Sequence, residues 1–245
     1  MKSEKQRRRI GRRAIIFVSR ESAYAFLLSN CDPASFRSMC NHYRMAILKG
    51  EVIPGWSIDQ FSEIRIPIRF DNMRPDVYPD RDGLVVRVED NAPVVEAMRW
   101  GFPPPKAASY YVTNVRNVAS PYWRPWLKIE HRCLVPASKF AEYGPETPKR
   151  EYWFSRKDGA PIWFAGIWRE WGGDRGPKSK PVPGPHRIFS FLTCEPNNVV
   201  KPIHAKAMPV ILSGKDCETW LTAPADIALT LQRPLPDDIL QVAQD

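Results

Sequence analysis

The sequence predicts a single α+β domain built on a curved β-sheet with short helices. Many short runs of β-branched and aromatic residues alternate with turn-forming residues, and few stretches show helical periodicity. The nine Trp and 25 Pro among 245 residues favour a compact, loop-rich fold over a helical bundle. A chain of this length suits one ordinary domain, and no internal repeat or second domain is indicated.

The predicted elements follow one another in short segments. A helical turn is expected at 43–49, then a proline-rich connection at 67–79. Leu84–Val88 is predicted to be a strand because Asp-Gly precedes it and Asp-Asn follows it. Further strands are expected at 94–100, 133–135, 151–154, 162–168, 188–193 and 208–212. Short helices are expected at 122–129 and 213–221, a mobile hairpin loop at 172–185, and a polar tail with one more helical segment at 224–244.

The first 38 residues differ from the rest in charge. They carry nine Lys or Arg against three Asp or Glu, whereas residues 39–245 carry 27 against 24. The arginines at 7–13 precede an apolar stretch, but polar residues at 19–22 interrupt what a secretory signal needs to be continuous. We expect 1–38 to be a basic extension outside the mature domain, 39–223 to be the catalytic domain, and 224–245 to be a C-terminal tail.

Composition excludes several classes of protein. No apolar run approaches the ~20 residues that span a membrane. The five cysteines are scattered, odd in number and without zinc spacing, so we expect no disulfide scaffold, no metal and no cofactor, in a reducing cytoplasm. The net charge of +9 permits a polyanionic partner without identifying one.

Four candidate residues, Cys40, Asn114, Glu142 and His204, each have an ordinary structural explanation when taken singly. Their surroundings are more specific. The chain carries, in order, Met-Cys-Asn at 39–41, Arg-Trp-Gly-Phe at 99–102, Asn-Val-Arg at 114–116, Arg-Cys-Leu-Val-Pro at 132–136, Phe-Ala-Glu-Tyr at 140–143, Ala-Gly-Ile-Trp at 165–168, and His204 followed by Met-Pro-Val-Ile-Leu at 208–212. Together these motifs resemble the SOS-response-associated peptidase (SRAP) family of abasic-site processing proteins, from Met39 to about Leu221.

The resemblance implies a barrel-like, mainly antiparallel sheet and a monomer that acts on single-stranded DNA containing abasic sites, at the bacterial nucleoid after damage. In this family the initiator Met is removed, which here would leave Cys40 as the first residue. A terminal Cys carries an α-amine of pKa about 8 and a thiol of pKa about 8.5. The amine can form a Schiff base with the abasic-site aldehyde, and the thiol can close on it to give a thiazolidine.

The resemblance also implies roles for the other residues. Asn114 would position Cys40 and the sugar, Glu142 would transfer protons, and His204 would assist ring opening or reversal. The expected DNA-binding residues are Arg44 and Arg116 on phosphates, Trp100 stacking on a base, Pro79 in a wedge loop, and Thr193 lining the pocket.

The sequence departs from the family pattern at several positions, and these leave alternative interpretations open. Residues 41–44 replace the family's Gly-Arg after the Cys, Val118 replaces a Glu, and Tyr143 replaces a Trp. His42 is an additional titratable group that either tunes the amine or thiol or serves a surface role. The extension would be explained by a true start at Met39, by a removed propeptide, or by an inactive fused version. Two other functions stay open: a cysteine peptidase with autoproteolytic processing, and a non-covalent DNA-binding module.

Overall fold

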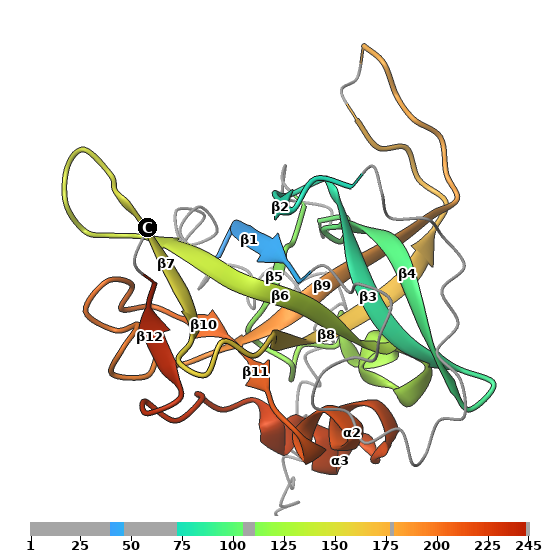
Figure 1. Cartoon of the computed structure of the whole chain (residues 1–245). Helices are drawn as coiled ribbons and strands as arrows, with labels where there is room; N and C mark the ends of the chain where they lie inside the picture. The colour runs from blue at the N-terminus through green and yellow to red at the C-terminus, as the bar shows by residue number, and fades with distance from the viewer. Residues whose placement is uncertain (1–39, 47–72, 105–110, 177–178, 244–245) are drawn as a thin grey trace, which may run out of the picture. The chain divides into compact units, whose positions relative to one another are not determined.

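The computed structural model describes residues 40–46, 73–104, 111–176 and 179–243, all within one compact unit, Ser38–Asp245. Its sheet contains twelve strands. These are β1 (His42–Met45), β2 (Asp76–Val77), β3 (Asp82–Glu89), β4 (Ala92–Trp100), β5 (Asn114–Val115), β6 (Arg132–Tyr143), β7 (Glu151–Arg156), β8 (Ile162–Trp171), β9 (His186–Cys194), β10 (Met208–Pro209), β11 (Ile211–Leu212) and β12 (Leu240–Val242). The helices are α2 (Lys215–Thr222), α3 (Ala225–Ala228) and 3₁₀ turns at Arg124–Leu127, Ile129–His131 and Leu229–Leu231 (Figure 1).

Five strands close into a barrel. In order around it, β8 pairs with β9, β9 with β4, β4 with β3, β3 with β6, and β6 with β8 again. The β4–β9 pairing is parallel and the other four are antiparallel. The expected α+β fold on a curved, mainly antiparallel, barrel-like sheet is therefore confirmed.

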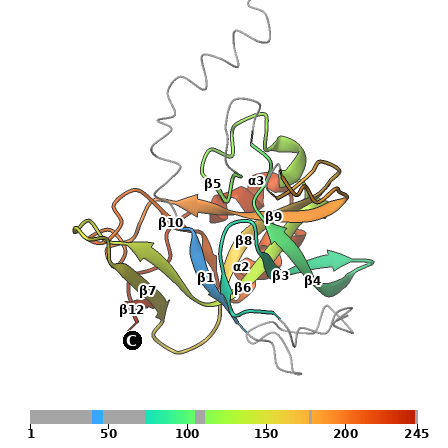
Figure 2. The same cartoon turned by 90° about the horizontal axis from the view of Figure 1, so that it is seen from above.

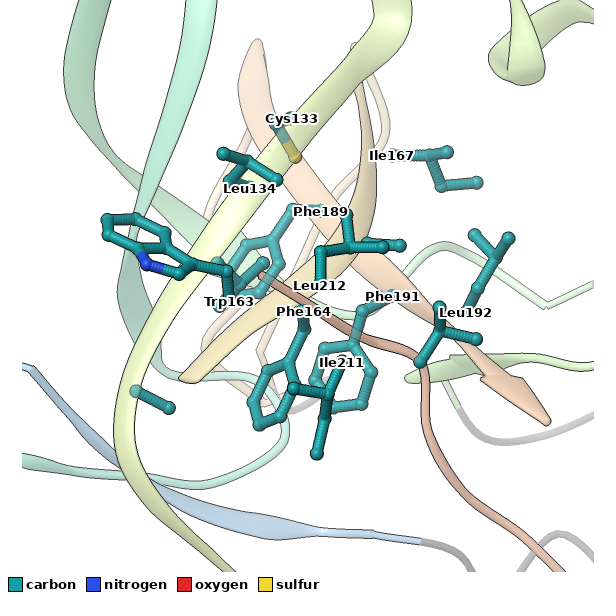
Figure 3. Packing of buried hydrophobic residues seen from close by; sticks show 14 of the residues in the cluster. Cys133, Leu134, Trp163, Phe164, Ile167, Phe189, Phe191, Leu192, Ile211 and Leu212 are labelled. Carbon is teal, nitrogen blue, oxygen red and sulfur yellow. The ribbon is translucent and has the colours of Figure 1, made fainter. Parts of the chain in front are cut away.

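Aromatic side chains fill the barrel. The rings of Phe164, Phe189 and Phe191 gather between the strands (Figure 3), and all three are fully buried. Tyr43 packs edge-on against Trp100, with ring centroids 5.2 Å apart. Burial of large aromatic surfaces supplies much of the free energy that holds such a small barrel closed.

The β3–β4 hairpin shows how local sequence fixes register. Glu89 pairs with Ala92, so only Asp90 and Asn91 form the turn. Both have positive φ, 51° and 60°. This is the geometry of a two-residue type I′ turn, which Asp and Asn tolerate better than other non-glycine residues.

The first half of strand β6 belongs to the barrel, and its second half lies at the candidate site. Its first half, to Ala137, pairs with β8, and its second half pairs with β1 and β7. Ser138 lies between the halves as an extra residue, because Arg44 faces Lys139 whereas Met45 faces Ala137. The Ser138 hydroxyl is 3.3 Å from the Arg44 carbonyl oxygen, to which it donates. The β7 and β12 strands continue the sheet beyond this point (Figure 2).

Helix α2 covers the outside of the barrel. Its Trp220 is fully buried and donates from Nε1 to the carbonyl oxygens of Cys133, at 2.9 Å, and Gly166, at 3.1 Å. A Cβ added at Gly166 would lie 2.7 Å from the Cys133 sulfur, so glycine is required where β6 and β8 approach. The helix predicted at 213–221 is thus confirmed.

Most predicted strands are confirmed, but the helical turn at 43–49 is wrong. His42–Met45 is the strand β1, paired on one side with β2 and on the other with β6. Pairing on both sides and burial of Tyr43 in the core override the local helical preference. Residues 47–49 and most of the proline-rich connection lie outside the described residues.

Two further predictions need refinement. The segment expected to be a polar tail contributes β12, which pairs with β7 and buries Leu240. The hairpin expected at 172–185 joins β8 to β9, but Arg175 in it is 1% exposed. Its guanidinium donates to Asp80 Oδ1 at 2.7 Å and to the Gly101 carbonyl at 2.8 Å, so the base of the hairpin is anchored to the barrel.

Candidate active site around Cys40

Cys40 lies two residues before the start of β1, and two neighbours hold its backbone. The antiparallel register pairs His42 with Ala141, so Asn41 lies opposite Glu142 and Cys40 is the residue before it. The backbone N–H of Cys40 donates a hydrogen bond to the Glu142 carboxylate. Asn114, the first residue of β5, donates from Nδ2 to the Cys40 carbonyl at 3.0 Å. The nitrogen and the carbonyl of Cys40 are therefore fixed from two different strands.

His204 completes the cluster. Its Nδ1 lies 3.8 Å from Glu142 Oε2 and 2.9 Å from the carbonyl oxygen of Ala207. A carbonyl oxygen can only accept, so Nδ1 carries the proton in this contact and Nε2 is left as the second functional nitrogen. The structure therefore brings together all four residues predicted as catalytic: Cys40, Asn114, Glu142 and His204.

Burial keeps the two central acids neutral. Desolvation, followed by the neighbouring Glu142, raises the pKa of the Cys40 thiol well above its ordinary value. Desolvation also raises the pKa of Glu142 well above its ordinary value, and the hydrogen bond from Cys40 offsets this only in part. Both effects follow from the cost of burying an unpaired charge. Burial thus favours the neutral form of both the Glu142 carboxyl and the Cys40 thiol.

Ten buried side-chain polar atoms among the described residues have no hydrogen-bond partner in the protein, and three of them belong to predicted site residues: Asn114 Oδ1, Thr193 Oγ1 and His204 Nε2. Their residues are 5%, 1% and 7% exposed. Buried polar groups are almost always satisfied, so such atoms call for a water or a ligand. These three atoms offer two acceptors and a hydroxyl group, and of their residues Asn114 contacts Cys40 directly.

The predicted DNA-binding residues have different environments. Arg44 is partly exposed and forms a paired contact with Asp76, at 2.9 and 3.1 Å. Pro79 is exposed in the turn after β2. Arg116 is partly exposed and forms an ion pair with Glu195. The two arginines and Pro79 can therefore reach a ligand at the surface.

Trp100 cannot play its predicted stacking role. It is 0% exposed, packs against Phe191 at a ring separation of 5.2 Å, and donates from Nε1 to the Thr113 carbonyl at 3.1 Å. A base could reach this indole only if the barrel opened. The prediction was wrong because tryptophan in a strand fills the core as readily as it lines a surface.

His42 is buried, so a surface role is excluded. It is 7% exposed, and its Nδ1 lies 2.8 Å from Glu151 Oε1. Sequence reasoning did not foresee this partner, nor the 2.9 Å hydrogen bond from Asn114 to the Thr113 hydroxyl. The sequence could have indicated Thr113, because it directly precedes the Asn-Val-Arg motif. It gave no indication of Glu151, whose position beside His42 depends on the β6–β7 register.

Within the described ranges, no group of three or more His, Cys, Asp or Glu is arranged to hold a metal ion. None of the helices described is both long and apolar enough to cross a membrane.

A closed β-barrel with Cys, Asn, Glu and His meeting beside one strand end defines a protein with a buried polar site centred on a cysteine. The family model described as SOS response associated peptidase (SRAP) matches residues 35–244. The chain belongs to this family. No curated protein gives a significant match to the sequence.

Solved structures share the fold. A Bordetella bronchiseptica protein is 23% identical with a TM-score of 0.60, covering 84% of this chain and all of its own. A Bacteroides thetaiotaomicron protein is 23% identical with a TM-score of 0.55, covering 70% of this chain and 78% of its own. A phage-related protein from Bordetella bronchiseptica is 18% identical with a TM-score of 0.56, covering 82% and 92%. At these identities the likeness concerns the fold alone.

Proposed function

We propose that this protein processes abasic sites in single-stranded DNA by forming a covalent bond between Cys40 and the aldehyde of the ring-opened sugar. The observation that carries the proposal is the contact between the Cys40 nitrogen and the Glu142 carboxyl. It places a proton-transfer group at the one atom that must act as the amine. Membership of an SOS-response-associated family supports a role in DNA damage.

The chemistry requires the nitrogen of Cys40 to be a free α-amine. The peptide bond to Met39 must therefore be absent, either because translation starts at Met39 and this initiator Met is then cleaved off, or because the whole segment up to Met39 is removed. The amine adds to the aldehyde carbon to give a carbinolamine, which loses water to form an imine. The thiol sulfur then bonds to the imine carbon and its proton ends on the nitrogen, closing a five-membered thiazolidine. Ring closure is intramolecular and gains a large effective molarity.

Glu142 supplies the proton that turns the carbinolamine hydroxyl into water. Burial raises its pKa well above the ordinary value and so favours the protonated state that a general acid needs. His204, through its unpartnered Nε2, serves the sugar oxygen during ring opening. Asn114 Oδ1 and Thr193 Oγ1 are left to bond the sugar hydroxyl groups.

DNA binding falls to the surface residues around this site. Arg44 and Arg116 would exchange part of their contact with Asp76 and Glu195 for phosphate oxygens. Such contacts carry affinity and salt dependence but no sequence preference. Pro79 would sit against the nucleotide beside the lesion.

Autoproteolysis is a second candidate, favoured by the peptidase description of the family. The Met39–Cys40 bond is the one that the Cys40 thiol would attack. Cleavage at this bond in the purified chain, and its loss in Cys40→Ala, would support self-processing. This candidate is compatible with the first, since such cleavage would liberate the α-amine.

The test is a denaturing gel of single-stranded DNA that carries one abasic site. Three proteins are compared: the chain from Met1, a version that starts at Met39, and Cys40→Ala in the second background. We expect a heat- and detergent-resistant shift with the Met39 version and none with Cys40→Ala. A shift with the longer chain as well would show processing, which intact mass locates. DNA retention that heat abolishes in all three would leave a non-covalent binding module and refute the proposal.

A further inference from the structure

The side chain of His42 contacts three separate parts of the fold around Cys40. Nδ1 lies 2.8 Å from Glu151 Oε1 on β7, and Nε2 lies 3.4 Å from Asp76 Oδ1 on β2. One face of the ring stacks on Tyr78, with centroids 4.1 Å apart and planes at 19°. The Trp153 ring packs edge-on against the imidazole, with ring centroids 4.5 Å apart. A buried imidazole with this many directed contacts has one orientation.

His42 also touches the nucleophile through its backbone. The Cys40 sulfur donates to the His42 carbonyl oxygen at 3.6 Å. The strand β1 is only four residues long, so its first residue depends on side-chain anchors more than a longer strand would. Whatever holds the His42 ring therefore also holds the carbonyl against which the thiol rests.

We propose that His42 is a positioning residue, which clamps the start of β1 between β2 and β7 and thereby fixes the Cys40 thiol. The expected effect of His42 on the crosslinking rate rests on the proposed function. Its expected effect on the position of the Cys40 thiol does not.

The structural part is tested by alkylating the full chain with iodoacetamide and following each cysteine by peptide mass mapping. His42→Ala is compared with wild type, and His186→Ala serves as the matched control, because His186 contacts Val182 and Trp171 at the β8–β9 hairpin. We expect Cys40 alkylation to accelerate about tenfold in His42→Ala. Cys133, Cys194 and Cys217, which are buried elsewhere, should keep wild-type rates. Unchanged Cys40 alkylation would overturn the clamp, and so would equal acceleration of all four thiols, which indicates general loosening.

The functional part uses the Met39 version and saturating abasic-site DNA. Loss of the clamp should lower the crosslinking rate by about 10- to 100-fold, the usual cost of a small misplacement, with affinity for intact single-stranded DNA unchanged within about twofold. His42→Gln, whose amide still donates to Glu151, should recover part of the rate and provides a second variant if the alanine form folds poorly. A fall in affinity at an unchanged rate would refute a positioning role. Absence of crosslinking by the unsubstituted protein would refute the proposed function alone, since the alkylation result stands without it.

Discussion

The backbone nitrogen of Cys40 donates a hydrogen bond to the side chain of Glu142, and Glu142 in turn lies 3.8 Å from His204. Three segments far apart in the sequence thus meet around the Glu142 carboxyl, which contacts the Cys40 nitrogen. That atom is the amine of the proposed chemistry, and the four predictions below follow from its surroundings and from the barrel that carries them.

Replacing Glu142 by Gln should slow crosslinking by about 10²- to 10⁴-fold, the usual contribution of a positioned proton donor. Glutamine keeps the volume and a hydrogen-bond acceptor but cannot deliver a proton. Single-turnover rates at saturating DNA measure the effect. Glu170→Gln, at a surface ion pair with Arg187, is the control and should be unaffected. An unchanged rate in Glu142→Gln would remove Glu142 from the mechanism.

The stability of the protein should depend on pH through the same carboxyl. Burial raises the pKa of Glu142 well above its ordinary 4.5, so the folded chain binds this proton more tightly than the unfolded chain. Its stabilising contribution is complete below the unfolded pKa and is lost as pH rises through the folded pKa. As pH rises above the ordinary pKa of 4.5, Glu142→Gln should gain free energy of unfolding relative to wild type. Denaturant unfolding at several pH values measures this, and parallel curves would contradict it.

Asn114→Ala should lower both stability and the crosslinking rate. The change leaves the buried Cys40 carbonyl without its donor, which costs about 1–3 kcal/mol in free energy of unfolding. It also frees the residue that must attack, so we expect a rate loss of about tenfold or more. Asn117→Ala, at an exposed position in the loop after β5, is the matched control. Equal behaviour of the two variants would show that the Asn114 amide does not position Cys40.

Trp100 should contribute to the core and not to DNA binding. Trp100→Ala should cost about 3–5 kcal/mol of stability, because it empties a fully buried site. Trp100→Phe keeps most of the volume and should bind single-stranded DNA like wild type, as measured by fluorescence anisotropy. A selective loss of affinity in the folded Phe variant would restore the stacking role.

The barrel strands were predictable because their local sequences are typical of β-strands. The runs at 84–88, 162–168 and 188–193 are rich in β-branched and aromatic residues and fall within β3, β8 and β9. The β1 strand was mistaken for a helix because its strand character comes from pairing with β2 and β6. The β5 and β12 strands, two and three residues long, are too short to show any period.

The candidate site was predictable from motif order, not from any physical pattern in the residues. Resemblance brought Cys40, Asn114, Glu142 and His204 together, and the structure places them in one cluster. The stacking role of Trp100 was wrong because it rested on the general ability of exposed aromatic rings to stack on bases, and Trp100 is buried. The His42 clamp was beyond reach, because Glu151 and Asp76 come to the imidazole only through the registers of two separate strand pairs.

The extra residue Ser138 determines on which face of β6 each later side chain lies. Side chains alternate between the two faces of a strand, so one inserted residue reverses the assignment of every position after it. When the alternation is followed along β6 from its first half, the Glu142 side chain comes to the face of Cys40 only because Ser138 is present as an extra residue. Deleting that one serine would keep the side chains of Cys40, Asn114, Glu142 and His204 but turn the Glu142 carboxyl to the opposite face of β6. A lineage that lost it would retain the motif Phe-Ala-Glu-Tyr without the geometry of the site, and the spacing of one residue between two motifs would be its only mark in the sequence.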